Sequence, residues 1–206
     1  MNHIIINIGR QFGSGGRQVA MELGRRLGMN TYDNELITKA AEQSGFSKEL
    51  FVRSDEKRSV FSMSSFFTSG NFNIQHSYIN DDDLFKIQSD VIKDTASKES
   101  AIFIGRCSDY ILRDLDCCID VFISCPLEIR AKRVAEREGI TPEEAEALCI
   151  KKDRTRATYY NYFTFGEWGV ASNYDLCLDS SKLGYEKCVE IIKGYMKVRF
   201  EGLELS

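Results

Sequence analysis

Short apolar runs alternate along the chain with stretches in which apolar residues recur at helical spacing. The runs short enough for a strand are residues 3–8, 29–32, 101–104, 119–124 and 174–178. Helical spacing or a helix-start signal predicts helices over residues 19–27, 34–41, 84–96 and 184–199, with further helices from Leu127 and from Thr141. Because parallel strands are joined through crossovers, this alternation predicts an α/β fold with a doubly wound parallel sheet.

A glycine-rich stretch joins the first predicted strand to the first predicted helix. It reads Gly-Arg-Gln-Phe-Gly-Ser-Gly-Gly-Arg-Gln from Gly9 to Gln18. Glycines let a phosphate approach the backbone N–H groups that a helix N-terminus leaves unpaired. The predicted phosphate-binding residues are Gly13, Ser14, Gly15, Gly16, Arg17 and Gln18. A tight strand-to-helix turn without a ligand is the alternative.

The stretch meets the P-loop formula G-x-x-x-x-G-K-[ST] only in part. Arg10 replaces the first glycine, Gly16 stands in the lysine position and Arg17 stands in the hydroxyl position. A guanidinium binds phosphate through two hydrogen bonds, so we expect Arg17 to return the positive charge. Nothing obvious replaces the hydroxyl group that would hold Mg²⁺, and we predict no metal-ligating residue.

Basic residues cluster at two later positions. Arg130 and Arg133 lie one turn apart on a predicted helix face, and residues 151–156 include Arg154 and Arg156. Charged stripes on helices are often solvated faces. Both clusters follow predicted strands in an acidic chain that also carries a glycine loop, which favours an arginine clamp on a transferring phosphate.

Three features allow more than one interpretation. Asp33 follows a predicted strand, so it either caps the next helix or binds a ligand at the carboxyl end of a parallel strand. Residues 53–83 show no clean period and are either a surface loop or a mobile segment that covers the substrate. The aromatic run 159–165, with Trp168 nearby, is a core wall, a base-stacking surface or the contact of a homodimer.

Composition excludes several classes. The chain has 206 residues, enough for one domain with a full core, and a formal net charge of −4, which gives no basic surface for nucleic acid or an anionic membrane. Its apolar start is too short for a membrane span and lacks the features of a signal peptide. Seven cysteines without a C-x-x-C pair and only two histidines argue against a zinc site. We therefore expect a cytoplasmic protein with reduced cysteines.

Several motifs recur in the order in which cytidylate kinases carry them. They are Gly13-Ser14-Gly15, Gly105-Arg106, the stretch 122–133, the run Asp153-Arg154-Thr155-Arg156 and the stretch 175–183. The chain therefore resembles the cytidylate kinase-like family of P-loop nucleoside monophosphate kinases. The resemblance covers nearly the whole chain except residues 53–83.

The resemblance implies a three-layer P-loop NTPase fold of the nucleoside monophosphate kinase type, with a five-stranded parallel sheet. Residues 1–206 would form a single P-loop kinase domain, with a mobile acceptor-binding insertion at about 45–83 and an arginine-bearing lid at about 138–170. The implied reaction is ATP-dependent phosphoryl transfer, with Mg²⁺, to a nucleoside monophosphate, CMP or dCMP. A kinase of another small acceptor and a catalytically inactive nucleotide-binding regulatory module are the alternatives. The implied partners are small-molecule nucleotides, with no nucleic acid polymer and no membrane.

The resemblance also implies roles for individual residues. The loop from Gly13 would hold the donor phosphates. The residues implied in acceptor binding are Asp33, Arg106 and Asp109. Those implied in catalysis are Arg17, within the donor-phosphate loop, and Arg154, Arg156, Arg130 and Arg133, which would close over the transferring group. The family's Gly-Arg-Asp motif reads Gly105-Arg106-Cys107 here, so one carboxylate of that motif is absent.

Overall fold

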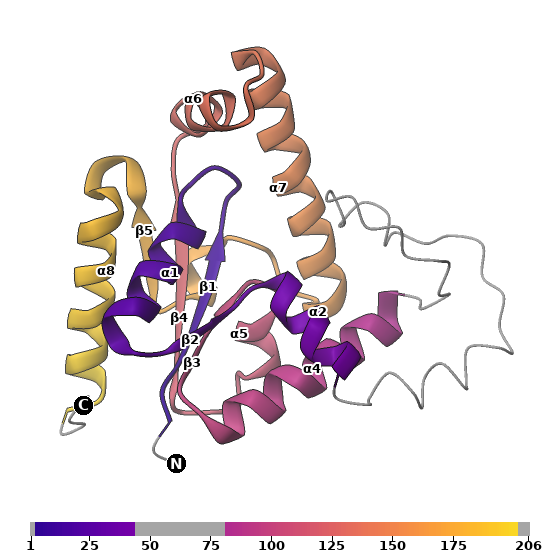
Figure 1. Ribbon diagram of the computed structural model, residues 1–206, viewed down its shortest axis with the longest axis vertical. Coiled ribbons are helices and arrows are strands. Elements are labelled where there is room, and N and C mark those ends of the chain that lie inside the picture. Colours follow the sequence, from indigo (N-terminus) through magenta and orange to yellow (C-terminus); the bar gives the residue numbers. More distant parts are fainter. Residues whose placement is uncertain (1–2, 44–80, 202–206) are drawn as a thin grey trace, which may run out of the picture.

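The computed structural model describes residues 3–43 and 81–201 (Figure 1). The predicted acceptor-binding insertion at 45–83 lies outside the described residues, apart from residues 81–83, which open a helix. Nothing in the described part therefore tests that prediction.

A five-stranded parallel sheet forms the centre of the fold, in the order β2-β3-β1-β4-β5. The strands are β1 (Ile5–Arg10), β2 (Asn30–Tyr32), β3 (Ala101–Ile104), β4 (Cys118–Ser124) and β5 (Leu176–Asp179). The longer helices are α1 (Gly16–Leu27), α2 (Asn34–Gln43), α4 (Asp81–Lys98), α6 (Leu127–Glu138), α7 (Pro142–Thr164) and α8 (Ser180–Arg199). Two short turns complete the described elements, α5 (Ser108–Ile111) and η2 (Ala171–Asn173). The predicted three-layer α/β fold with a parallel sheet is confirmed.

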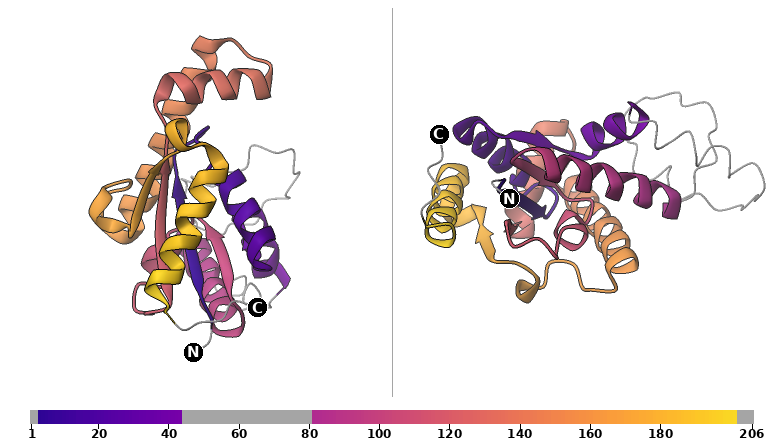
Figure 2. Two further views of the ribbon diagram at one scale, coloured as in Figure 1. Left: turned by 90° about the vertical axis from the view of Figure 1, so that its left-hand side faces the viewer. Right: turned by 90° about the horizontal axis from the view of Figure 1, so that it is seen from below.

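Apolar side chains cover both faces of the sheet. Ile6 and Ile8 of β1 pack with α1 and α8, whereas Ile5 and Phe103 pack on the opposite face with α2, α4 and α5. Figure 2 shows α1 and α8 on one side of the sheet and α4 and α7 on the other. Neighbouring residues of β1 thus enter different cores, as a strand buried on both faces requires.

Some predicted boundaries differ from the structure. The first strand continues to Arg10, because its register with β4 runs to the pair Arg10 and Ile123. The last strand is β5 rather than residues 174–178, and α8 begins directly after it. Asp179 caps that helix by accepting the Ser181 N–H at 2.8 Å. The predicted start at Gly184 is instead a non-helical residue inside α8, with φ of 69°.

The predicted lid region is mainly one long helix. At its start Thr141 and Glu144 form a capping box, and the helix continues to Thr164. Within the aromatic run, Tyr159 is buried and Phe163 stacks on Phe85 of α4 with ring centroids 4.1 Å apart. Core packing therefore accounts for these two rings. Tyr162 and Phe165 are exposed, and the homodimer stays a prediction.

A buried polar pair on β1 and β4 makes stability depend on pH. Asn7 donates to the Asp120 carboxylate at 2.8 Å, and burial, followed by the nearby Asp109 and Asp175 carboxylates, raises the pKa of Asp120 from 3.8 to about 6 despite that bond. The native state therefore binds more protons than the unfolded state between pH 4 and 6. We expect the free energy of unfolding to fall by about 2 kcal/mol as pH rises through this window. Urea titrations at several pH values should show a smaller loss in Asp120→Asn than in the parent protein, because the pKa of Asp109 is also raised and that carboxyl remains in the variant. An equal loss in both would contradict the prediction.

Candidate active site

The glycine loop between β1 and α1 has the geometry of an anion site. Gly13 and Gly15 have φ of 77° and 84°, and Gly15 is the N-cap of α1. The first N–H groups of a helix have no intrahelical partner, so the start of α1 presents donors to a ligand. Ser14 turns inward: its hydroxyl donates to the Gln11 carbonyl at 2.8 Å, while its own carbonyl accepts from Ser180 Oγ at 2.5 Å.

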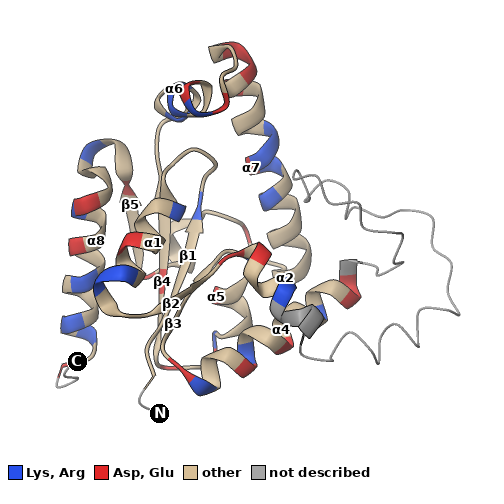
Figure 3. Cartoon of the chain, viewed as in Figure 1, with Lys and Arg blue, Asp and Glu red and all other residues tan. Residues whose placement is uncertain are grey.

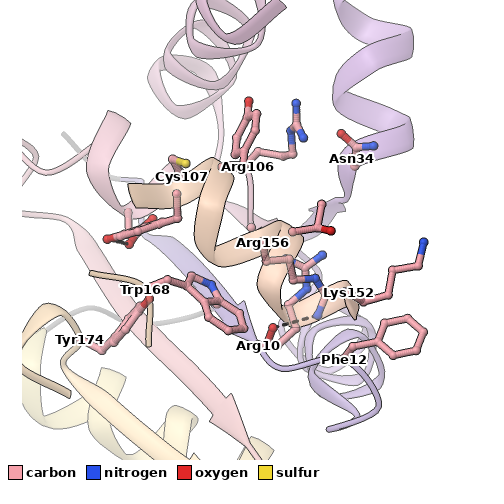
Figure 4. A pocket seen from close by; sticks show the side chains of 15 residues that line it. Arg10, Phe12, Asn34, Arg106, Cys107, Lys152, Arg156, Trp168 and Tyr174 are labelled. Carbon is pink, nitrogen blue, oxygen red and sulfur yellow. Dashed lines mark hydrogen bonds between the residues drawn. The ribbon is translucent and has the colours of Figure 1, made fainter. Parts of the chain in front are cut away.

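A cavity of about 220 Å³ lies beside this loop, between the carboxyl ends of β1 and β3 and the helix α7. Three arginines line it, each from a different element: Arg10 from β1, Arg106 after β3 and Arg156 from α7 (Figure 4). Lys152 of α7 adds a fourth basic side chain. Figure 3 shows basic residues at the end of β1 and along α7. The cavity is therefore suited to an anionic ligand.

Arg156 contacts the backbone of the residue that precedes the glycine loop. Its Nη1 donates to the Arg10 carbonyl at 3.0 Å and lies 3.8 Å from Asp153. Burial lowers the pKa of Arg156 although Asp153 acts against that shift. The guanidinium is therefore a partly desolvated charge at the junction between loop and cavity.

Arg106 is oriented by two neighbours. Its guanidinium donates to the side-chain oxygen of Gln88, at 2.8 Å from Nε, and lies 4.4 Å from the ring centroid of Tyr159. Arg106 itself has φ of 62°, a conformation that bends the chain directly after β3. Gln88 is buried in α4, so it fixes the position of the Arg106 guanidinium from inside the protein.

Asp109 faces the same cavity. It accepts the Tyr160 hydroxyl at 2.8 Å, and burial raises the pKa of Asp109 although the hydrogen bond from Tyr160 lowers it. Burial, with the nearby carboxylate, also raises the pKa of Tyr160. The two groups form a polar part of the wall of the cavity that the three arginines also line.

Asp33 and Arg17 form an ion pair at the loop. The Arg17 Nη2 lies 2.9 Å from Asp33 Oδ2, and the Arg17 side chain is 63% exposed. Asp33 also accepts the N–H groups of Glu35 and Leu36, so it caps α2 at the carboxyl end of β2. Partial burial acts to raise the pKa of Asp33, but the bonds from Arg17 and from Leu36 N–H outweigh it and the pKa is lowered.

The other predicted arginines lie outside the cavity. Arg130 is buried and donates to the carbonyls of Cys125 and Phe12 and to Asp153 at 2.6 Å. Arg133 donates to the Ser14 carbonyl at 3.3 Å, and Arg154 is exposed on α7. Arg130 and Arg133 thus hold the glycine loop through its backbone carbonyls at Phe12 and Ser14. Whether any of the three acts on a substrate stays a prediction.

Several residues of the site were not expected from the sequence. Arg10 was noted only as a departure from the loop formula, and the signal that could have marked it is its position directly after the predicted strand and before the glycines of the loop. Gln88 lies on a helix with no motif around it, and Tyr160 belongs to the aromatic run 159–165, for which no acid-pairing role was expected. Asn34 lines the cavity, and its side-chain oxygen is buried with no hydrogen-bond partner within residues 3–43 and 81–201.

The residues of the site do not fit a directly coordinated magnesium ion. Arg17 occupies the position of the metal-binding hydroxyl, and the carboxylates of Asp33 and Asp153 are paired with arginines. In the described part of the chain there is no group of three or more histidine, cysteine or acidic side chains that could hold a metal.

A parallel sheet in this order, with a glycine loop between β1 and α1, defines a P-loop kinase fold. The model of the cytidylate kinase-like family matches residues 5–182, and the chain belongs to that family. Family and fold make it a nucleotide kinase, a phosphotransferase. Among the helices described, none is long and apolar enough to cross a membrane, and the cytoplasmic location stays a prediction.

The chain is similar to several proteins at low sequence identity. A protein named cytidylate kinase from Methanopyrus kandleri is 24% identical over 92% of this chain and 91% of its own. Another protein named cytidylate kinase, from Methanobrevibacter smithii, is 26% identical over 95% of this chain and 99% of its own. A crystal structure of an uncharacterized protein from Eubacterium ventriosum has a TM-score of 0.74 at 28% identity, covering 95% and 99% of the two chains. Shikimate kinase from Bacteroides thetaiotaomicron shares the fold, with a TM-score of 0.51 at 12% identity. The match covers 94% of this chain and 98% of the shikimate kinase chain.

Proposed function

We propose that the protein transfers the γ-phosphoryl group of ATP to the phosphate of CMP or dCMP, giving ADP and the nucleoside diphosphate. One observation carries the proposal: Arg10, Arg106 and Arg156 line a single cavity directly beside a helix N-terminus with a glycine loop. The loop suits the donor phosphates and the cavity suits an acceptor phosphate. The relatives named cytidylate kinase support the choice of pyrimidine acceptor.

On the donor side, the backbone N–H groups from Gly13 to Arg17 would bind the β- and γ-phosphates of ATP. Magnesium would arrive coordinated by those phosphates and by water, since Mg²⁺ keeps several waters and binds substrate phosphates readily. The chain's own contribution is then a rigid loop, supported by Arg133 and Ser180 at the Ser14 carbonyl.

On the acceptor side, Arg106 and Arg156 would bind the monophosphate. Arg106 is held by Gln88 and Tyr159, so its guanidinium is oriented before the ligand enters. Asp109 and Tyr160, which line the same cavity, would offer hydrogen bonds to the ribose or base. These groups would take over the orienting role of the carboxylate that Cys107 replaces.

The transfer itself needs positioning and positive charge. An oxygen of the acceptor phosphate attacks the γ-phosphorus, the bond from that phosphorus to the bridging oxygen breaks, and ADP leaves with the electron pair. The transition state is loose and spreads negative charge over the equatorial oxygens, which arginines stabilise without a strong base. The described site supplies such cations from β1, from the turn after β3 and from α7.

ADP formation with different acceptors tests this proposal. We expect ATP turnover to require an acceptor and to be faster with CMP or dCMP than with UMP or AMP, measured with purified protein, ATP and Mg²⁺. Turnover with none of the four would contradict the proposed acceptor. In that case ATP binding without ADP formation indicates a regulatory module, and turnover with a wider panel of small hydroxyl acceptors indicates another kinase.

A further inference from the structure

Gly16 occupies the position where a P-loop carries its lysine, and the side chain of Arg10 fills the space beside it. A Cβ atom on Gly16 would lie 2.5 Å from Arg10 Cβ and 3.0 Å from Arg10 Cγ. Real Cβ atoms do not approach other carbon atoms so closely. The stem of Arg10 therefore runs through the region into which a side chain at position 16 would leave the helix.

A second glycine makes room for the guanidinium of the same residue. A Cβ on Gly105, directly after β3, would lie 2.0 Å from Arg10 Nη1. The Arg10 side chain thus starts at the end of β1, passes Gly16 and ends against Gly105, inside the cavity that Arg106 and Arg156 also line (Figure 4). Two positions without side chains accommodate one arginine.

The Arg10 guanidinium has no counter-ion in the part of the chain that the structure describes: no carboxylate there forms an ion pair with it. Burial, together with the charges of Arg156 and Arg106, lowers the pKa of Arg10 to about 9 although the carboxylates of Asp33 and Asp153 act against that shift, so the group is still protonated at pH 7. A partly desolvated cation beside two other arginines is stabilised by a bound anion.

We propose that Arg10 replaces the P-loop lysine, with the charge moved from position 16 to position 10 and its guanidinium binding the phosphoryl group that passes from donor to acceptor. This inference rests on the proposed function. It also explains why Gly16 is present: a side chain there would collide with the stem of Arg10. A guanidinium offers the transferring group two parallel hydrogen bonds where an ammonium offers a point charge.

Arg17 is the competing candidate for the same role. It follows the lysine position directly, but its guanidinium is held by Asp33 and is largely exposed to solvent. The two assignments predict opposite results for Arg10→Gly and Arg17→Ala, so they can be separated.

An exchange of the two residues tests the proposal. The variants are Arg10→Gly, Gly16→Lys and the double variant, and the measurements are ATP affinity by calorimetry and acceptor-dependent ADP formation. We expect Arg10→Gly to lower kcat/KM by about 100- to 1000-fold and to weaken ATP binding. Gly16→Lys alone should not help, because Arg10 blocks it. The double variant, with lysine in its standard place, should recover about tenfold or more over Arg10→Gly.

Controls keep the result interpretable. Arg25→Ala removes an exposed arginine from α1, paired there with Glu22, and should change neither quantity. Thermal unfolding of each variant shows whether it folds. If the double variant does not fold, Arg10→Lys provides the second test: it keeps a cation at position 10 and should therefore lose less activity than Arg10→Gly.

The outcomes separate the inference from the function on which it rests. Parent-like ATP affinity and turnover in Arg10→Gly would overturn the inference, as would loss of ATP binding in Arg17→Ala alone. If the parent binds ATP but phosphorylates no acceptor, the proposed function fails, and the ATP affinity of Arg10→Gly still decides the role of Arg10. A parent protein that binds no ATP overturns both.

Discussion

Arg156→Ala should lower kcat for acceptor-dependent ADP formation by about 100- to 1000-fold. The guanidinium of Arg156 lines the cavity, carries a partly desolvated charge and reaches the carbonyl that precedes the glycine loop. Charge that stabilises the transition state more than the bound substrate acts on kcat, so we expect KM for ATP to change much less. Steady-state kinetics with varied ATP and varied acceptor measure both quantities.

Two further variants define the cause of that loss. Arg156→Lys keeps the charge but loses the planar fork, so it should have intermediate activity. Arg25→Ala serves as the surface control, and thermal unfolding shows whether the hydrogen bond to the Arg10 carbonyl matters for folding. Parent-like kcat in Arg156→Ala would remove this arginine from the mechanism. An unchanged kcat with a raised KM for the acceptor would assign it to binding alone.

Asp153→Ala should destabilise the fold by about 3–5 kcal/mol. The Asp153 carboxylate accepts the Phe12 N–H at 2.7 Å and pairs with Arg130 at 2.6 Å, and the side chains of Asp153 and Arg130 are only 15% and 7% exposed. Its removal leaves a buried guanidinium without a counter-ion and releases the start of the glycine loop from α7. Urea denaturation measures the free energy of unfolding, and ATP affinity should fall together with it because Phe12 directly precedes Gly13.

The double variant Asp153→Leu/Arg130→Met provides the control for this prediction. Replacing both charges with apolar side chains of similar volume removes the unpaired cation, so part of the lost stability should return. Asp94→Ala, which breaks an exposed ion pair with Lys98 on α4, should change stability little. If Asp153→Ala were as stable as Asp94→Ala, the ion pair would not hold the loop to α7.

Much of the fold was predictable because its signals are local. Runs such as Ala101–Ile104 are apolar at every position, which is the pattern of a strand buried on both faces, and the structure has β3 there. The capping residues Thr141 and Glu144 likewise marked the start of α7. The errors lie at element ends: the end of β1 is decided by pairing with β4, and pairing is not visible in the residues of one strand.

The sequence signal for the candidate site was clearest at the glycine loop, where the pattern itself has a structural meaning. The loop from Gly13 to Arg17 could be recognised because glycines before a helix leave N–H groups free. The sequence also placed Arg106 and Arg156 among the candidate residues. It did not distinguish Arg156 from Arg130, because both are arginines on helices, whereas in the structure Arg130 is paired with Asp153 and Arg156 lines the cavity.

By itself, the sequence determined an α/β fold with a glycine loop at the start of its first helix, because hydrophobic period and glycine placement are properties of neighbouring residues. The tertiary structure alone decided which basic side chains share a cavity. Arg10, Arg106 and Arg156 are far apart along the chain, and they come together because parallel strands end at one edge of the sheet and α7 packs across that edge. Only that packing shows that Gly16 and Gly105 leave room for Arg10.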